Sequence, residues 1–186
     1  MKTSEPKPKQ CCMCPREFWP RSSLHSVCSQ RCAMKKLKAK AVEEKAELKA
    51  RKEAIKTLPQ LKREAQIEFN AYIRARDAGQ PCICCGKPLG DDSPGGAFDC
   101  GHYRSVGSAP QLRFDERNAH AQRKQCNRWG AGRAVDYRLG LIARIGLDAV
   151  ESLEQENEVR KWTRQELIEI RATYKAKRKE LEGGRE

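Results

Sequence analysis

Three polar side chains in the second half of the chain are candidates for acid–base and metal-assisted hydrolysis, such as that of a phosphodiester. His102 lies in FDCGHYRS, Asn118 in ERNAH and Asn127 in QCNRW. Attack of water on a phosphodiester needs a base with a pKa near neutrality and a cation that stabilises the developing charge. The ordinary pKa of histidine, about 6.5, predicts that His102 is the general base. Asn118 is predicted to hold its imidazole in the required tautomer, through a side-chain or backbone carbonyl.

Side chains that carry oxygen ligands are expected to hold the cation. Asp99 and Asn127 are the candidates, and a partly open oxygen site of this kind suits Mg²⁺ or Mn²⁺. Along an extended strand, Asp99 should lie on the opposite face from His102, whereas Cys100 should share its face.

Ten cysteines fall in short paired spacings. Cys11 and Cys14 form one pair, and Cys28 and Cys32 form another just before a helical run, so four thiolates can close a tetrahedral zinc site. Cys12 competes with Cys11 for the first position. This segment has too few apolar residues to fold around a core, and zinc accounts for its folding.

A second zinc site is predicted from Cys82, Cys85 and Cys126. These residues supply only three thiolates. The fourth ligand is left open among Cys84, Cys100, His120 and water.

The chain carries excess positive charge and too little apolar surface for a large core. Of its 186 residues, 38% are hydrophobic and 34% are charged, and the formal net charge is +13. The positive electrostatic potential of such a chain favours a polyanion as partner. Charge alone does not separate DNA from RNA or from an anionic membrane surface. We expect no membrane span and no secretory signal, because the apolar runs that both require are missing.

Helix-forming residues dominate the stretches that precede the second cysteine group. Residues 33–56 have few large apolar side chains and predict an exposed basic helix. Pro59 breaks or restarts it. Residues 60–79 place one apolar face at helical spacing, with Gly79 as the stop, and its members are Leu61, Ala65, Phe69, Tyr72, Ile73 and Ala75.

A small domain is expected to begin at Pro81. It contains the second cysteine group, a Gly/Asp/Pro loop and one strand of a hairpin. Residues 135–159 read as helical with an interruption near Gly146, and Thr163 with Glu166 predicts a capping box that opens a last helix. Three tryptophans are expected to be packing residues: Trp19, Trp129 and Trp162.

The order of these residues resembles that of HNH, or ββα-metal, nucleases. The resemblance extends over most of the chain to the NinG (Rap) family of lambdoid phage recombination endonucleases. It is carried by the paired cysteines with CSQRC, the basic helix, PCICCG, DCGHYRS, APQLRFDERN, the CN pair, LIARIG and KWT. It implies a metal-dependent, structure-selective endonuclease that cleaves branched DNA, such as Holliday junctions and D-loops, in the cytoplasm of the bacterial host.

Three positions depart from the patterns of these families. An acidic residue directly precedes the histidine in the general HNH pattern, but Gly101 stands there. Arg123 replaces a thiolate of the second knuckle. Ala131-Gly132-Arg133 replaces Ser-Gly-Asn, which puts activity in doubt if that asparagine assists the metal.

The predicted fold is α+β and mostly helical, with a small HNH-like core, zinc knuckles, a long basic helix and C-terminal helices. The predicted regions are a zinc-finger-like module at 1–32, a basic helical connector at 33–80, the nuclease core at 81–135 and a helical region at 136–186. The predicted contacts to nucleic acid are Lys35, Lys36, Lys38, Arg104, Arg123, Lys124 and Arg128.

Two other functions fit the same residues. The first is a catalytically inactive, zinc-dependent nucleic-acid-binding protein on this scaffold. The second is a zinc-bearing adaptor whose basic helix binds a protein partner. A homodimer would suit the nuclease, because symmetric cleavage of a four-way junction needs two active sites.

Overall fold

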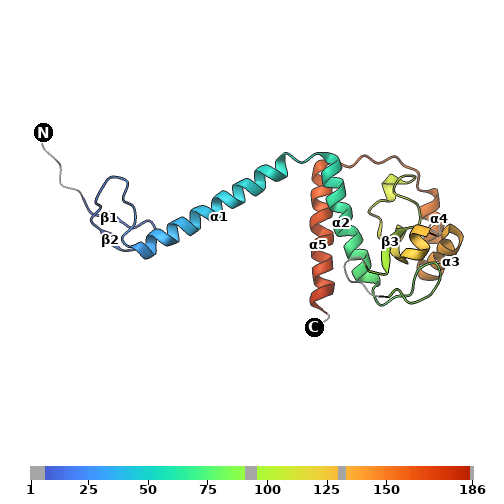
Figure 1. Cartoon of the computed structure of the whole chain (residues 1–186). Helices are drawn as coiled ribbons and strands as arrows, with labels where there is room; N and C mark the ends of the chain where they lie inside the picture. The colour runs from blue at the N-terminus through green and yellow to red at the C-terminus, as the bar shows by residue number, and fades with distance from the viewer. Residues whose placement is uncertain (1–6, 91–95, 130–132, 185–186) are drawn as a thin grey trace. The chain divides into compact units, whose positions relative to one another are not determined.

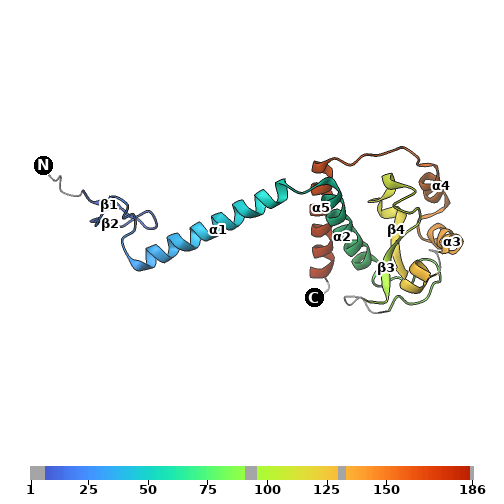
Figure 2. The same cartoon turned by 45° about the horizontal axis from the view of Figure 1, so that its top comes forward.

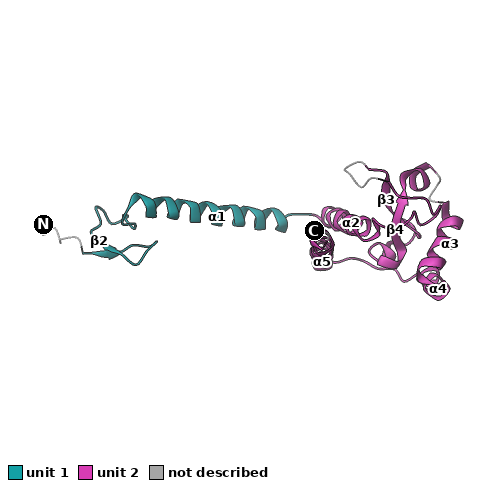
Figure 3. Ribbon diagram, turned by 90° about the horizontal axis from the view of Figure 1, so that it is seen from below, with its two compact units in different colours: residues 1–56 teal, residues 57–186 magenta. Residues whose placement is uncertain are grey.

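The computed structural model describes residues 7–90, 96–129 and 133–184, and it separates into two compact units, residues 1–56 and 57–186 (Figure 3). The boundary falls inside the predicted connector at 33–80, and the predicted regions 81–135 and 136–186 lie within one unit. The division into four regions stays a prediction. The Gly/Asp/Pro loop at 91–95 and the pair Ala131-Gly132 lie outside the described residues.

Unit 1 consists of a short hairpin, a cysteine-rich turn and one long helix (Figure 1). β1 (Lys9–Gln10) pairs antiparallel with β2 (Glu17–Phe18), and α1 (Gln30–Ala54) follows. The hydroxyl of Ser29 caps α1 by accepting a hydrogen bond from the N–H of Cys32 at 3.3 Å. Cys32 is the buried residue of α1. The helix is therefore anchored at its first turn and is not held along its length by a core within its unit.

Unit 2 is built around two helices that lie side by side, α2 (Leu58–Asp77) and α5 (Arg164–Gly183) (Figures 1 and 2). They run in the same direction, because Arg171 pairs with Glu64 and Arg178 pairs with Glu68 further along. Both begin with a capping box. The predicted apolar face of α2 is buried, and it forms one core cluster with Phe114, Ala119, Leu167 and Tyr174.

A two-stranded sheet lies between the helix pair and a second layer of helices. β3 (Phe98–His102) pairs antiparallel with β4 (Ala119–Arg123), with Phe98 opposite Arg123 and His102 opposite Ala119. Short helical turns at Pro110–Leu112, Glu116–Asn118 and Gln125–Trp129 flank the strands. Beyond the sheet, α3 (Ala134–Ile145) and α4 (Leu147–Gln155) form a second core cluster, with Ile83, Leu112, Tyr137, Leu141, Val150 and Leu153 among its members.

A buried carboxylate joins α2 to β4. Asp77 is 4% exposed, and its Oδ2 accepts a hydrogen bond from the N–H of Ala121 at 2.9 Å. The Arg76 guanidinium lies 2.7 Å from Oδ1, and Arg144 and His120 lie 3.6 Å and 3.5 Å from Oδ2. Burial alone would raise the pKa of Asp77, but these partners hold it well below its usual range. The ionised group therefore fixes the position of the strand against the helix.

The predictions from local sequence patterns are largely confirmed. The fold is mostly helical α+β with two small sheets, Pro59 lies in the first turn of α2, and Thr163 with Glu166 caps α5. The helix expected at 33–56 begins at Gln30 and ends at Ala54. None of the described helices is long and apolar enough to cross a membrane.

Two of the three tryptophan predictions are wrong. Trp162 packs against Phe114, with ring centroids 5.0 Å apart. Trp19 and Trp129 are 68% and 76% exposed. Trp19 directly follows β2 and Trp129 ends the short helical turn after β4, and neither belongs to a core cluster of the described residues.

A tight contact between α3 and the second cysteine group gives a stability prediction. A Cβ at Gly140 would lie 1.7 Å from the carbonyl oxygen of Ile83. Gly140→Ala should therefore lower the free energy of unfolding by about 1–3 kcal/mol, the usual cost of overpacking, as measured by denaturant unfolding. A Cβ at Gly79 meets nothing within 4 Å, so Gly79→Ala is the matched control. Equal stability of the two variants would contradict the contact.

Candidate active site and two cysteine clusters

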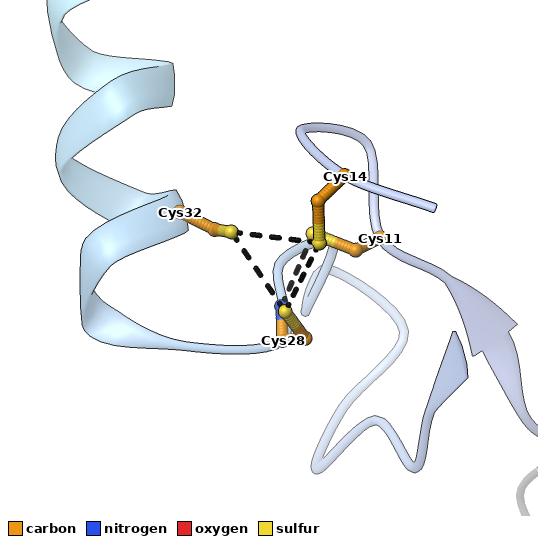
Figure 4. Close-up of side chains that lie close together, drawn as sticks. All are labelled: Cys11, Cys14, Cys28 and Cys32. Atoms are coloured by element: carbon orange, nitrogen blue, oxygen red, sulfur yellow. Dashed lines mark hydrogen bonds between the residues drawn. The ribbon is translucent and has the colours of Figure 1, made fainter. Parts of the chain in front are cut away.

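The first cysteine cluster joins the hairpin of unit 1 to the start of α1 (Figure 4). The sulfur of Cys28 lies 3.5 Å from that of Cys14 and 3.7 Å from that of Cys32, and the sulfurs of Cys32 and Cys14 are 3.7 Å apart. With the Cys11 sulfur, all four lie within 4.8 Å of one another. A disulfide holds its sulfurs at about 2.05 Å, whereas tetrahedral zinc with Zn–S bonds of about 2.3 Å spaces them by roughly 3.8 Å. The cluster fits zinc, and Cys12 is exposed outside it.

Backbone amides favour a thiolate in this cluster. The N–H of Cys28 donates to the sulfur of Cys11 at 3.3 Å. Burial opposes ionisation, yet the amide hydrogen bonds lower the pKa of Cys11 to about 6. The hydrogen bond with Cys14, followed by burial, raises the pKa of Cys28 to about 12. One thiol of the cluster thus ionises readily, and the protons of the others must be released when a metal binds.

The second cluster resolves which residue is the fourth ligand. Its sulfurs, all within 4.8 Å of one another, belong to Cys82, Cys84, Cys85 and Cys126. Cys84 therefore completes the set, with its sulfur 3.6 Å from that of Cys82. The other protein candidates lie elsewhere, since Cys100 packs against the core cluster of α2 and His120 belongs to the Asp77 network. Arg123 still contributes to the cluster, because its backbone N–H donates to the sulfur of Cys82 at 3.3 Å.

His102 is the last residue of β3, and its ring is held by two neighbours. The imidazole lies beside Phe69 of α2, with ring centroids 6.0 Å apart, and its Nε2 lies 3.2 Å from the carbonyl oxygen of Arg113. A carbonyl can only accept a hydrogen bond, so Nε2 carries the proton and Nδ1 carries the lone pair. Burial lowers the pKa of His102 against the opposing effect of that carbonyl. The imidazole is therefore neutral at pH 7.

The other ring nitrogen of His102 can be reached by solvent. Nδ1 makes no hydrogen bond within the described part of the chain. The described side-chain atoms that are fully buried without a hydrogen-bond partner belong to Glu53, Arg113 and Arg178, so Nδ1 is not fully buried. It is therefore at least partly accessible. A neutral, accessible ring nitrogen opposite a fixed N–H is the arrangement that a general base requires.

Asn118 acts on the loop that precedes it. Its buried side chain accepts a hydrogen bond from the N–H of Arg104 at 2.9 Å and donates to the carbonyls of Arg104 and Leu112 at 3.0 Å and 3.2 Å. Its own carbonyl accepts from the N–H of Tyr103 at 2.8 Å. These bonds tie together the ends of loop 103–118, which carries Arg113. The sequence predicted that Asn118 holds the imidazole of His102 through a carbonyl. In the structure the carbonyl of Arg113 accepts that hydrogen bond, and Asn118 positions the loop that carries Arg113.

The structure brings Asp99 to Asn127 but not to His102. The amide of Asn127 donates to Asp99 Oδ2 at 3.3 Å, and the Arg128 guanidinium holds the two carboxylate oxygens at 2.8 Å and 3.2 Å. Cys100 and His102 both face the core cluster of α2, as strand alternation predicts. Asp99 lies on the other face. The oxygen ligands proposed for magnesium are therefore together, but a cation of the protein itself already pairs with them.

The basic residues predicted to bind nucleic acid differ in their surroundings. Lys35, Lys36 and Lys38 are exposed on α1. The Arg104 guanidinium donates to the carbonyls of Leu153, Glu154 and Glu156 at the C-terminal end of α4, which gives it a structural role. Arg123 and Lys124 are half-buried at the end of β4. Contact of each with nucleic acid remains a prediction.

Sequence reasoning missed two members of the site. Arg113 contributes through its backbone carbonyl, and a residue of any type can supply that group, so no pattern indicated it. Arg128 was assigned to nucleic acid. Its position directly after Asn127 could have indicated the ion pair, because both residues lie on one short helical turn facing Asp99.

Zinc content tests the two clusters. Purified protein should contain two zinc ions per chain, as measured by elemental analysis. Cys84→Ser should reduce this to one, because it removes a ligand from the second cluster. Cys12→Ser and Cys100→Ser should retain two, since these thiols lie outside both clusters. Loss of zinc with Cys100→Ser and full retention with Cys84→Ser would contradict the assignment.

Comparisons with known proteins agree on one family. The family described as "Bacteriophage Lambda NinG protein" matches residues 3–184. Proteins named "Protein ninG" from Salmonella phage P22, Escherichia phage 933W and Escherichia phage lambda are 44%, 43% and 43% identical to this chain over the aligned residues. The aligned regions cover 74%, 76% and 74% of this chain and 66%, 68% and 65% of those proteins.

The chain thus spans about two thirds of the length of these relatives. No solved structure shows significant similarity to it. The family match includes both cysteine clusters and the strand that ends in His102. The chain belongs to the NinG family.

Proposed function

We propose that this protein is a metal-dependent endonuclease of the HNH type that cleaves branched recombination intermediates such as Holliday junctions and D-loops. One observation carries the proposal. The Nε2 proton of His102 is directed to the carbonyl of Arg113, and Nδ1 is neutral, accessible and without a hydrogen-bond partner in the described chain. The carbonyl that fixes this tautomer belongs to the loop that Asn118 clamps.

The proposed reaction is hydrolysis of a phosphodiester by an activated water. Nδ1 of His102 takes a proton from the water as its oxygen bonds to phosphorus, and the bond from phosphorus to the 3′ oxygen breaks. The imidazolium that forms keeps its hydrogen bond to the Arg113 carbonyl. That bond strengthens as the ring becomes charged, so the loop stabilises the product of proton transfer.

A divalent cation would stabilise the negative charge on the phosphate and on the leaving oxygen. Asp99 and Asn127 are the residues proposed to hold it, because their side chains lie together, and the Asn127 amide, whose nitrogen donates to Asp99, would turn its oxygen to the cation. Arg128 must then release Asp99. The cysteine clusters are proposed to bind zinc in a structural role. In the second cluster, Cys126 fixes the start of the helical turn that carries Asn127 and Arg128.

Branched DNA as the substrate rests on the family resemblance and on the net charge of +13. The relatives are phage proteins by name, and the proposal places the activity in the cytoplasm of the bacterial host. A homodimer would place two sites on one junction.

A second candidate function is zinc-dependent binding of DNA without cleavage. The ion pair between Asp99 and Arg128 favours it, because an internal cation occupies the carboxylate that a metal would need. The two candidates make the same prediction for binding and opposite predictions for hydrolysis.

Replacement of His102 distinguishes them. In His102→Gln, the side-chain amide can still donate to the Arg113 carbonyl, but it cannot accept a proton at neutral pH. Cleavage of a labelled branched DNA in the presence of magnesium should fall by about 10²-fold or more, while binding to the same DNA is retained. The wild-type rate should keep its plateau to below about pH 6.5, because burial lowers the pKa of His102.

The matched control is His25→Gln. His25 lies in unit 1, where its Nδ1 accepts a hydrogen bond from the N–H of Arg21 at 3.1 Å. Its replacement should leave cleavage unchanged. If His102→Gln cleaves as fast as the wild type, His102 is not the base, and if neither variant nor the wild type cleaves, the binding function is favoured.

The magnesium requirement tests the proposed cation ligands in two directions. Asn127→Ala should raise the magnesium concentration needed for half-maximal cleavage, because it removes a ligand. Arg128→Gln should lower it, because the substitution removes the cation that competes for Asp99. Cleavage rates measured across a magnesium titration would show both shifts. Unchanged requirements in both variants would place the cation elsewhere.

A further inference from the structure

α1 carries one continuous face of positive charge. Successive residues of an α-helix lie about 100° apart around its axis and rise by about 1.5 Å. Six basic residues of α1 consequently fall within roughly 100° of arc and extend over roughly 32 Å along the helix. We call this set the basic stripe, and its members are Arg31, Lys35, Lys38, Lys45, Lys49 and Lys52.

The acidic residues of α1 are segregated from the basic stripe. Glu44 and Glu47 lie on the opposite side of the helix, where they pair with Lys40 at 3.6 Å and with Arg51 at 3.9 Å. Glu53 shares the angular position of the stripe, but it belongs to the last turn and pairs with Lys56 at 2.8 Å. Every member of the stripe is exposed, and none has an ion-pair partner among the described residues.

This distribution is unfavourable for a helix that only connects two parts of a chain. Lys45 and Lys49 are four residues apart, and Lys49 and Lys52 are three apart, so their like charges are neighbours and repel each other. A solvated connector gains more from alternating charges, as the opposite face of α1 shows. A polyanion laid along the stripe would remove the repulsion.

The chemistry of the stripe favours phosphate. Five of its six members are lysines, whose compact ammonium groups bind phosphate as point charges and do not offer the paired donors that read base edges. An anionic membrane would require a broad apolar face beside the basic one. The large apolar residues of α1 are few. Met34, Leu37 and Leu48 form only a narrow row, within roughly 60° of arc beside the stripe, and Val42 lies within the arc of the stripe itself.

We propose that the basic stripe is a docking surface for the sugar-phosphate backbone of duplex DNA and binds it without reading its sequence. The first cysteine cluster holds the start of this surface, because Cys32 lies one residue after Arg31 within the same turn. The inference rests on the proposed function only in taking DNA as the ligand. It requires no cleavage.

Two double variants with equal loss of charge test the inference. The stripe variant is Lys45→Gln, Lys49→Gln, and the control variant is Lys40→Gln, Arg51→Gln from the other side of α1. Glutamine preserves the helix. Affinity for a short linear duplex is measured across a salt series without added magnesium or manganese, so that no cleavage occurs, and helix content is checked by circular dichroism.

The stripe variant should show a slope of log affinity against log salt that is smaller in magnitude by about 1 to 2, since each phosphate contact contributes about 0.9. The control should change the slope by less than half as much. Equal changes would mean that only net charge matters, and no change in either variant would place the duplex elsewhere, so both results overturn the inference.

The last measurement is binding of the wild type and both variants to vesicles of phosphatidylserine and phosphatidylcholine. Loss of vesicle binding in the stripe variant, with duplex binding unchanged, would assign the stripe to membranes and overturn the inference. The nuclease proposal stands or falls separately. A protein whose stripe binds duplex DNA but whose His102→Gln variant behaves as the wild type would retain this surface and lose the proposed active site.

Discussion

The structure depends on two cysteine clusters, one in each unit. Within each cluster, four sulfurs lie within 4.8 Å of one another. Such a cluster costs much of the conformational freedom of the chain, and neighbouring thiolates repel one another, so it is stable only when a metal compensates. In unit 1 the cluster joins the turn after β1 to the first turn of α1. In unit 2 the cluster joins the segment after α2 to the helical turn after β4. The strand that carries the candidate base is thus supported on one side by the helix pair and on the other by the second cysteine cluster.

The sequence was informative where a structure is determined by neighbouring residues. The apolar spacing of α2, the capping box of α5 and the paired cysteines all depend on contacts within a few positions, and each was found as predicted. The fourth ligand of the second cluster was not determined in this way. Spacing left Cys84, Cys100, His120 and water open, and the packing of β3 against α2 turns Cys100 away from the cluster. The carbonyl of Arg113 is a stronger example, because a long-range contact made by the backbone leaves no trace in residue type.

Strand alternation imposes the main constraint on the candidate site. His102 faces α2, whereas Asp99 faces the helical turn that carries Asn127 and Arg128. The base and the oxygen ligands therefore belong to different faces of one two-stranded sheet. A nuclease that uses both must place the scissile phosphate at the end of β3, where His102 is the last residue of the strand and the backbone turns into loop 103–118. Gly101, in the position where HNH nucleases have an acidic residue, cannot supply a ligand there. The chemistry thus depends on whether Asp99 can exchange Arg128 for a metal.

In the proposed function, the two units contribute by different physical means. Unit 2 depends on fixed positions, because proton transfer from water to His102 requires a ring held in one tautomer by a clamped loop. Unit 1 depends on charge, and a row of lysines along a helix needs no such precision to attract phosphates. Attraction of this kind raises the rate of encounter and retains the DNA after encounter, without selecting a bond to cleave. Selection of the bond then falls to unit 2, where a single carbonyl decides which nitrogen of His102 can act as a base.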